Sequence, residues 1–409
     1  MRIVALTFGT EGDTRPMLAL CRGLLDAGHD VFVLAERSGE AFATTLGVPF
    51  VALAGDMAAE MESAGSDLLP RGDDVKRVAR ALSDIATRHT KDWMRASLAH
   101  ARGADAILGA GLAIYVGLSC AEALRIVPIG IALQPMMPTR AFPSPFLPPR
   151  RLPKVLNRVS HQLVLAMMWR AFRGAINDAR RDVAQQPRRR RQWDGYPILF
   201  GMSPTLVARP PDWPDRFTVT GDWWFRAETY APDRGLETFL GEGDAPIYVG
   251  FGSMTGFDRE RLLANVLDAL DGRRALLSAG WSGFGEAALP PNVRRIGHVP
   301  HAWLLPRVRL AMHHGGAGTT HAAAHAGVPS VVVPFAADQF FWADRLHALG
   351  IAPARLSYRD VTAVALRERI AAASDDRMRD RARQIGCAMA DERGVANAVA
   401  RIGTLLAAT

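Results

Sequence analysis

One stretch of the sequence, residues 308–334, constrains the fold more than any other. An apolar run over 308–312 leads into a glycine-rich turn, an alanine-rich segment and a second apolar run over 330–333. Short apolar runs are typical of buried strands, and strands that are joined through a helix pair in parallel. The stretch therefore predicts a strand–turn–helix–strand unit of a parallel sheet.

The same alternation occurs in both halves of the chain. At 409 residues the chain is long enough for two domains, each with its own core. We therefore expect an α/β protein with two doubly wound, Rossmann-like domains that face each other across a cleft. The apolar runs that predict strands cover residues 2–8, 31–35, 48–53, 106–108, 127–131, 198–200, 246–251, 275–278, 293–296, 308–312 and 330–333.

The helical patterning and a proline-rich linker set the expected domain boundaries. Helices are expected over about 16–27, within 56–103, over 157–182 and over 258–270. We expect an N-terminal domain over 1–215, a C-terminal domain over 216–377 and a helix over 378–409. That last segment is long enough to return to the N-terminal domain.

Composition excludes several classes of protein. Hydrophobic residues make up 49% of the chain and charged residues 22%, as in ordinary globular proteins. The three cysteines, Cys21, Cys120 and Cys387, are far apart, so they indicate neither a disulfide framework nor a zinc site. The sequence has no signal peptide and no run of 18 apolar residues, which predicts a cytoplasmic protein.

The net charge of +8 does not indicate nucleic-acid binding. Only three of the 49 basic residues are lysine, so arginine enrichment runs through the whole chain. The clusters at 149–154 and 188–191 have no interleaved aromatic residues of the kind that stack on bases. They predict a solvated basic loop or, as the alternative, peripheral contact with an anionic membrane surface.

The glycine-rich turn indicates a site for a phosphate group. A strand that opens through Gly315 and Gly316 into a helix offers free backbone N–H groups and a positive dipole end. His313 or His314 adds a neutral or cationic donor beside that turn. Asp338 and Gln339 follow the next strand, where they are placed to meet whatever is attached to the phosphate. This combination predicts an enzyme that holds a nucleotide-linked group.

The N-terminal loop carries the other candidate for chemistry. Asp13 lies on a glycine loop directly after the first strand, three residues before Pro16. Its carboxylate is suited either to capping a helix or to acting as a general base. The loop is not a GxGxxG fingerprint, and the residues alone leave both roles open.

Eight segments together resemble one family of enzymes. They lie at residues 9–16, 134–143, 219–224, 248–254, 278–281, 297–306, 313–320 and 334–342. In this order they resemble the GT-B, nucleotide-sugar-dependent (UGT-like) glycosyltransferases, and most of all the bacterial and fungal sterol glucosyltransferases and the glycopeptide-antibiotic glycosyltransferases. The resemblance covers nearly the whole chain, and the segment 297–342 is its most specific part.

The resemblance implies a role for each matching residue. Asp13 corresponds to the catalytic base, where plant relatives have a histidine. Asp338 and Gln339 correspond to the pair that binds the sugar, and His298 with Val299 to the contact with the nucleotide base. Because plant relatives have a stacking tryptophan where this chain has His298, discrimination between uracil and thymine stays open. The implied cradle for the donor diphosphate consists of Ser253, His313, Gly315, Gly316, Ala317, Gly318 and Thr319.

Residues for the acceptor come from the N-terminal half. The proline-rich segment 134–149 is either a packed loop or a wall for an apolar ligand, and the Met and aromatic face of the helix 157–182 is typical of core packing or, as the alternative, of a pocket for a bulky ligand. The candidates are Thr10, Gln134, Met136, Phe142, Met167 and Met168. Glu11 departs from the sterol group, in which a basic residue is frequent at this place, so the charge of the acceptor is not predicted.

The expected function is transfer of a hexose from a UDP- or TDP-sugar to a hydroxyl of an apolar small molecule, with inversion and without a metal. The acceptor is a sterol-like lipid, a polyketide or another natural-product aglycone, and no cofactor is expected beside the nucleotide sugar. His321 and His325 lack a third metal ligand. The alternatives are a nucleotide-sugar epimerase and a non-catalytic lipid-binding protein. A monomer and a homodimer are both compatible with the sequence.

Overall fold

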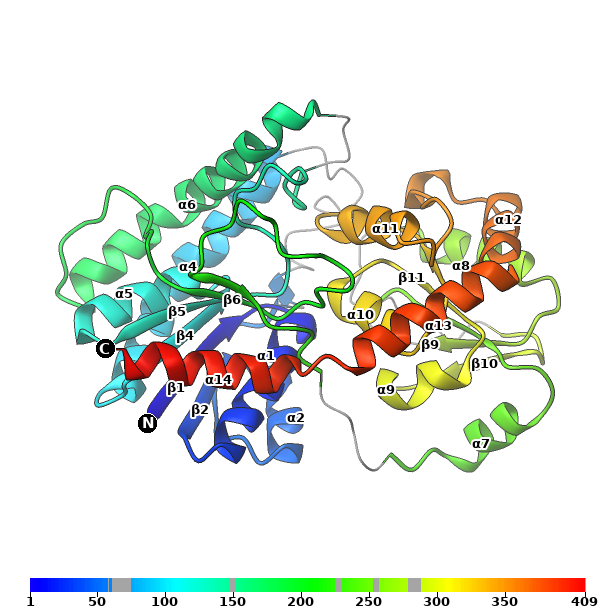
Figure 1. Ribbon diagram of the computed structural model, residues 1–409, viewed down its shortest axis with the longest axis horizontal. Coiled ribbons are helices and arrows are strands. Elements are labelled where there is room, and N and C mark those ends of the chain that lie inside the picture. Colours follow the sequence, from blue (N-terminus) through cyan, green and yellow to red (C-terminus); the bar gives the residue numbers. More distant parts are fainter. Residues whose placement is uncertain are drawn as a thin grey trace. The chain divides into compact units, whose positions relative to one another are not determined.

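The computed structural model describes residues 1–57, 59–60, 75–147, 152–224, 230–252, 257–278 and 288–408. The chain forms two compact units (Figure 1). The described part of the first unit runs to Trp224 and includes the C-terminal residues from Arg393 onward. The described part of the second unit covers residues 230–392.

The first unit is built on a parallel sheet of seven strands. Its order is β3-β2-β1-β4-β5-β6-β7, and each pairing of neighbours is parallel. The order reverses between β1 and β4, and such a switch point opens a crevice at the carboxyl ends of the strands. The strands are β1 (Arg2–Phe8), β2 (Asp30–Glu36), β3 (Phe50–Leu53), β4 (Ala106–Gly111), β5 (Val127–Ala132), β6 (Ile198–Phe200) and β7 (Phe217–Val219).

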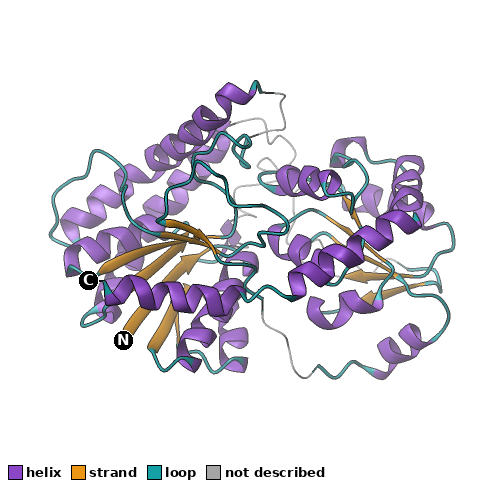
Figure 2. Cartoon of the chain, viewed as in Figure 1, coloured by secondary structure: helices purple, strands orange, loops and turns teal. Residues whose placement is uncertain are grey.

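Helices cover both faces of this sheet (Figure 2). One core layer contains side chains of the helices α1 and α14, and the other contains side chains of α4, α5 and α6. The helical elements are α1 (Glu11–Asp26), η1 (Arg37–Gly39), α2 (Glu40–Thr45), α4 (Val75–Ala101), α5 (Ile114–Leu124), η2 (Lys154–Leu156), α6 (Asn157–Asp182) and α14 (Gly394–Ala407).

The second unit is built on a parallel sheet of five strands in the order β10-β9-β8-β11-β12, with its switch point between β8 and β11. The strands are β8 (Ile247–Gly250), β9 (Ala275–Ser278), β10 (Val293–Ile296), β11 (Leu310–His313) and β12 (Ser330–Val332). The helical elements are α7 (Arg234–Gly241), α8 (Arg259–Leu270), α9 (His301–Leu304), η3 (Leu305–Arg307), α10 (Ala317–His325), α11 (Gln339–Ala348), η4 (Tyr358–Asp360), α12 (Ala363–Ala373) and α13 (Asp376–Ala390).

The doubly wound α/β architecture expected from the sequence is confirmed, but three boundaries differ. Helix α1 begins at Glu11 rather than near Pro16, because Thr10 caps it, and Pro16 lies inside the helix. Strand β7 pairs with β6, so residues 217–219 lie in the first unit and not in the second. The single helix expected over 378–409 is two helices, α13 and α14.

Helix α14 packs against the first unit's sheet. Ala398, Ile402 and Leu406 enter the same core layer as the buried face of α1. The amide of Asn397 donates to the carbonyl of Thr220 over 2.9 Å. At Gly394 a Cβ would lie 2.1 Å from the carbonyl oxygen of Asp222, so only glycine permits this approach. The chain's end is therefore an integral part of the first unit.

The arginine cluster at 188–191 is partly structural. The Arg189 guanidinium pairs with Glu122 at 3.2 Å and lies over the ring of Trp193. The carbonyl of Arg190 accepts a hydrogen bond from the indole N–H of Trp169. The side-chain amide of Asn177 donates to the carbonyl of Arg189 and accepts the N–H of the same residue. These bonds fix the loop after α6 onto the first unit.

None of the described helices has the combination of length and hydropathy that crossing a membrane requires. Cys21 and Cys120 are buried, Cys387 is exposed, and none of the three forms a disulfide.

Replacement of Ile402 tests how far the first unit depends on α14. Ile402 is fully buried, and removing a buried isoleucine down to alanine costs about 2–5 kcal/mol. We expect Ile402→Ala to lower the urea midpoint followed by circular dichroism. Thr404→Ala, at an exposed position of the same helix, is the control and should leave the midpoint unchanged. Equal midpoints for the two variants would contradict this packing.

Candidate active site

The switch point of the second sheet brings two glycine turns together. Strand β8 leads into Gly252 and strand β11 into Gly315, and both glycines have positive φ, 59° and 90°. A Cβ on Gly315 would lie 2.9 Å from the carbonyl oxygen of Gln339 and from Val332 Cγ1. The turn after β11 therefore requires glycine, and it lies directly against the start of α11.

The ring of His314 lies between glycines of the two turns. A Cβ on Gly252 would lie 2.8 Å from its Cε1, and a Cβ on Gly316 would lie 2.4 Å from its Nε2. Either side chain would displace the ring. Burial and, to a smaller extent, the nearby His301 lower the pKa of His314 to about 4. A hydrogen bond with the Gly250 backbone has a smaller effect and raises the pKa. His314 is therefore a neutral packing element that holds the two turns in place.

His313 is fully buried at the end of β11. Its Nδ1 accepts the backbone N–H of Gly315 over 3.1 Å, so the ring proton of the neutral form lies on Nε2. Burial, and after it the nearness of His314 and His301, lowers the pKa of His313 to about 3. At neutral pH this side chain is therefore an N–H donor and not a cation.

The Nε2 atom of His313 is buried without a hydrogen-bond partner among the described residues. Leaving a buried donor unsatisfied costs about 1–3 kcal/mol, and such groups are rare in native proteins. A ligand that brings an acceptor oxygen to Nε2 removes this cost. The orphaned donor is therefore available to an acceptor oxygen.

The N-terminus of α10 supplies further donors beside this histidine. The helix begins at Ala317, and its N-cap residue Gly316 makes no side-chain capping bond. The first backbone bond within the helix runs from Thr320 N–H to Gly316 O at 2.9 Å. The preceding N–H groups therefore point out of the helix at its positive end. A Cβ on Gly318 would meet no atom within 4 Å, so the space above this turn is open.

Asp338 and Gln339 hold the loop beside the turn. The Oε1 atom of Gln339 accepts the N–H groups of Phe335 at 2.8 Å and Ala336 at 3.1 Å. Asp338 Oδ2 accepts the indole N–H of Trp342 at 3.0 Å. The non-glycine Ala337 between these residues has a positive φ of 53°. Bonds within the loop thus fix both candidate side chains in orientation.

Trp342 also links this loop to α10. Its ring meets that of His321 edge-on at 4.9 Å, and His321 Nδ1 lies 2.8 Å from the carbonyl oxygen of Ala317. His321, which has no clear role in the sequence, therefore braces the helix whose N-terminus forms the turn. Across the described ranges, no group of three or more His, Cys, Asp or Glu residues is arranged to hold a metal ion.

The loop after β10 is the third element near the histidines. His298 is exposed, whereas Val299 packs on the core layer that contains Tyr248. His301, which follows two residues later, has Nε2 at 3.1 Å from the Tyr248 hydroxyl. His301 also contributes to the lowered pKa of both His313 and His314. Sequence reasoning did not single out His301 or Tyr248, because nothing in their spacing predicts that they lie near the turn. Ser253 lies outside the described residues.

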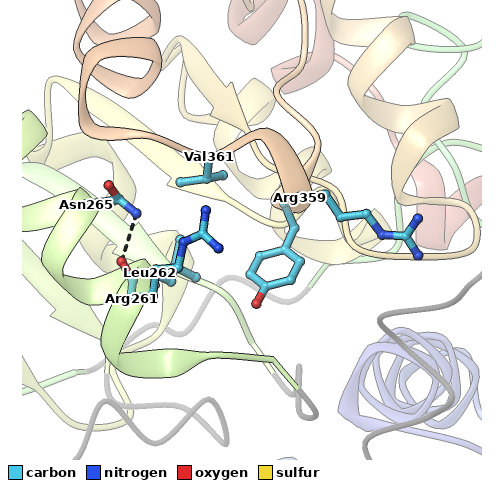
Figure 3. Close-up of a pocket in the computed structure, with 6 residues that line it drawn as sticks. Arg261, Leu262, Asn265, Arg359 and Val361 are labelled. Atoms are coloured by element: carbon cyan, nitrogen blue, oxygen red, sulfur yellow. Dashed lines mark hydrogen bonds between the residues drawn. The ribbon is translucent and has the colours of Figure 1, made fainter.

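A pocket of about 180 Å³ lies between α8 and η4, and the glycine turns do not line it (Figure 3). None of the residues predicted from the sequence lines it. Its lining residues are Arg261, Leu262, Asn265, Tyr358, Arg359 and Val361.

In the first unit, Asp13 lies at the N-terminus of α1, directly after β1. Its Oδ2 accepts the N–H of Thr10 at 3.0 Å, while Thr10 Oγ1 accepts the N–H of Gly12 at 3.3 Å, which forms a capping box. A Cβ on Gly9 would lie 2.2 Å from Asp13 Oδ2, so glycine is needed for the carboxylate to fold back. The capping role considered from the sequence is therefore present. The half-buried carboxylate is held beside the switch point between β1 and β4.

The structure brings two of the acceptor candidates together through a buried histidine. His161 of α6 has Nδ1 at 3.0 Å from the carbonyl of Met136 and Nε2 at 3.1 Å from that of Phe142. Burial lowers the pKa of His161, against the opposing effect of these two backbone contacts. The segment that carries Met136 and Phe142 is thus fastened to α6, the helix that carries Met167 and Met168. Gln134, Met167 and Met168 are partly exposed.

Comparison with known proteins agrees with this architecture. The structure of the glycotransferase of kitacinnamycin superposes with a TM-score of 0.72 at 23% identity, covering 99% of both chains. The glycosyltransferase VinC in complex with dTDP superposes with a TM-score of 0.68 at 18% identity, covering 100% of both chains. The two parallel-sheet units therefore define the GT-B glycosyltransferase fold.

The sequence comparisons identify the relatives. Residues 266–402 match the family described as erythromycin biosynthesis protein CIII-like, C-terminal domain. A sterol 3-beta-glucosyltransferase of Arabidopsis thaliana is 33% identical over 422 residues, which cover 98% of this chain and 64% of that protein. A sterol 3-beta-glucosyltransferase of Emericella nidulans is 32% identical over 426 residues, covering 98% of this chain and 30% of that protein. The chain is similar to these sterol 3-beta-glucosyltransferases over nearly its whole length, and it spans less than two thirds of the length of these relatives.

The buried histidines predict how stability depends on pH. Their pKa values are lowered from 6.5 to about 3 and about 4, so below pH 6.5 the unfolded chain takes up protons there that the folded chain does not. Their contribution to stability is complete above pH 6.5 and falls as the pH drops, by about 1.4 kcal/mol per pH unit for each histidine. We expect His313→Gln to have a shallower loss of urea stability between pH 7 and pH 5 than the unsubstituted protein.

His298→Gln is the control for that measurement, because it removes an exposed histidine from the same unit. It should retain the slope of the unsubstituted protein. If His313→Gln also retains that slope, the buried, neutral state of His313 is refuted.

Proposed function

We propose that the chain is an inverting, metal-independent glycosyltransferase that moves a hexose from a UDP- or TDP-sugar to a hydroxyl of an apolar acceptor. The observation that carries the proposal is the orphaned Nε2–H of His313 beside the uncapped N-terminus of α10. Together these groups form a preorganised set of neutral donors for oxyanions. The names of the relatives supply the reaction class, since those proteins are glucosyltransferases and VinC was solved with dTDP.

The proposed role of the second unit is to stabilise the leaving group. When the bond between the anomeric carbon and the donor oxygen breaks, negative charge grows on the nucleoside diphosphate. Oriented N–H groups in a buried site stabilise such charge without reorganising during the reaction. We assign this role to His313 Nε2 and to the backbone N–H groups of residues 316–319. The Gly315 N–H already bonds His313 Nδ1, so Gly315 and Ser253 are assigned by resemblance alone. Because the donors are neutral amides and an imidazole, they supply this stabilisation without a metal ion.

The remaining donor contacts are proposed for the loops on either side of the turn. Asp338 and Gln339 bind the sugar hydroxyls, and their bonds to Trp342 and to the 335–336 backbone preset their orientation. His298 and the Val299 backbone contact the nucleotide base. The His298 side chain is exposed, whereas Val299 packs on the core layer.

The proposed role of the first unit is to bind and activate the acceptor. The hydroxyl oxygen forms a bond to the anomeric carbon as its proton passes to the Asp13 carboxylate. A single displacement inverts the anomeric centre. The apolar acceptor contacts Thr10, Gln134, Met136, Phe142, Met167 and Met168, and it belongs to the sterol-like lipids or the natural-product aglycones.

A donor panel tests the proposal directly. UDP- and TDP-hexoses are incubated with a sterol, with a polyketide aglycone or with neither, and free nucleoside diphosphate is measured together with the glycoside. We expect release of nucleoside diphosphate that depends on an acceptor, with one product of inverted configuration. Epimerised sugar nucleotide in the arm without acceptor would identify an epimerase instead, and no turnover in any arm would overturn the proposal.

Replacement of Asp13 separates its chemical role from its capping role. In Asp13→Asn the amide oxygen can still accept the Thr10 N–H, so the fold should be retained while the base is lost. General-base help is worth about 10²–10⁴-fold, and we expect kcat to fall within that range with unchanged affinity for UDP or TDP. Glu11→Gln removes a neighbouring carboxylate that pairs with Arg15, and kcat should stay within about twofold. An active Asp13→Asn variant would refute the assignment of the base.

Replacement of Gly316 tests the donor turn by calorimetry with UDP and TDP. The new Cβ of Gly316→Ala would collide with His314, so we expect nucleotide affinity to fall at least tenfold. Gly241→Ala is the control, since a Cβ there meets nothing within 4 Å at the end of α7. Unchanged nucleotide affinity in Gly316→Ala would contradict the assigned diphosphate site.

A further inference from the structure

The first turns of α6 have an inverted amphipathic pattern. Their inward face is polar, with Asn157, Ser160 and His161 almost completely buried. In most surface helices the inward face is apolar and the polar residues face the solvent. Beyond these turns α6 returns to the usual pattern, since Trp169 and Phe172 enter the core.

Hydrogen bonds fix this orientation of the helix. The Asn157 amide donates to the carbonyl of Arg140 at 3.0 Å, and Ser160 Oγ accepts the N–H of Ser144 at 2.9 Å. The contacts of His161 with the backbone of the same segment complete the set. Rotating α6 to bury an apolar face would break these bonds, so the outward direction of the other face is determined by the fold.

The outward face carries a stripe of large apolar side chains. Val155 is 83% exposed, Leu156 42%, Val159 43% and Leu163 62%, and we call these four residues the α6 stripe. Val159 and Leu163 are spaced by four residues of α6, which places them on one side of the helix, and Val155 and Leu156 precede them in η2. Only two other large apolar residues among the described ranges are exposed, Met1 and Val364. The stripe is therefore a concentration of apolar surface and not scattered exposure.

The chain segment that contains the α6 stripe is rich in basic residues, although the carboxylate of Asp212 lies near Arg158. The sequence contains no Asp or Glu from residue 123 to residue 177, and within that span it contains eight basic residues. They are Arg125, Arg140, Arg150, Arg151, Lys154, Arg158, Arg170 and Arg173. Lys154 and Arg158 are exposed and lie within the stripe's own residue range, and Arg170 and Arg173 are exposed farther along α6.

We propose that the α6 stripe docks on an anionic phospholipid membrane. Its apolar side chains enter the boundary between headgroups and acyl chains, while Lys154 and Arg158 bind lipid phosphates. A nucleic acid does not suit the stripe, because its four side chains are aliphatic and offer no ring for base stacking. A second copy of the chain would bring like charges together across a two-fold interface. The proposal goes beyond glycosyl transfer and is tested without donor or acceptor.

The test measures binding of the full chain to vesicles by flotation. We compare phosphatidylcholine vesicles with vesicles that also contain phosphatidylglycerol, at low and at high salt. We expect binding to the anionic vesicles alone, and less binding at high salt because the charges are screened. No binding to anionic vesicles at low salt would overturn the proposal.

Variants locate the binding surface. Leu163→Glu should weaken partitioning to anionic vesicles at least tenfold, because a charge replaces a side chain that enters the membrane. Val364→Glu is the control at an equally exposed apolar position, 61% against 62%, and should bind like the unsubstituted chain. Equal partitioning of Leu163→Glu and Val364→Glu would overturn the assignment to α6.

Charge reversal tests the basic part separately. Arg158→Glu should weaken binding at least fivefold, since each basic residue near an anionic surface contributes about fivefold. Arg37→Glu, at an exposed position of η1, is the matched control and should have little effect. Sedimentation of the same proteins supplies the last outcome. If the unsubstituted chain is a dimer that Leu163→Glu dissociates, and if neither protein binds vesicles, the stripe is a self-association surface and the proposal fails.

Discussion

The candidate donor site depends on the packing of one imidazole ring against two glycines. His314 occupies the space that side chains at Gly252 and Gly316 would fill, so the turns after β8 and β11 approach each other closely. That approach sets the direction in which α10 leaves the sheet and places its uncapped N-terminus at the switch point. Burial keeps the ring neutral, because a charged ring would lose its hydration there. A packed, uncharged histidine thus acts as the structural support of the turn.

His313 is also a buried, neutral histidine, but its ring offers a hydrogen-bond donor instead of packing between glycines. The Gly315 N–H occupies its Nδ1, which leaves a proton on Nε2, and Nε2 has no partner among the described residues. A buried donor of this kind lowers the stability of the free protein and raises the affinity for a ligand with a suitable oxygen. The sequence left open whether His313 is neutral or cationic, and the burial of its ring decides for the neutral form.

Asp13 shows how a structural and a chemical role coincide in one residue. The capping box holds the carboxylate over Gly9, and the same bonds restrain its position at the end of β1. From the sequence, helix capping and general-base catalysis were alternative roles for Asp13. In the structure one carboxylate oxygen makes the capping bond, and the carboxylate still lies at the switch point. The two roles are therefore compatible, and only the acceptor reaction distinguishes a cap from a base.

The sequence by itself determined the alternation of strands and helices, because buried parallel strands are short apolar runs separated by amphipathic helices. It also predicted the residues of the glycine turn after β11, since positive φ and close backbone approach require glycine. It did not predict the start of α1, strand β7 or the break between α13 and α14. Those depend on a cap, on pairing with β6 and on contact with the backbone at Asp222.

Only the tertiary structure decided the state of the histidines and the outward face of α6. His301 acts on His313 and His314 through proximity between segments that are separate in the sequence. The polar face of α6 is buried because a distant segment offers it hydrogen-bond partners, and local periodicity carries no information about such partners. Protonation states and exposed faces follow from neighbours in space, which a sequence pattern does not specify.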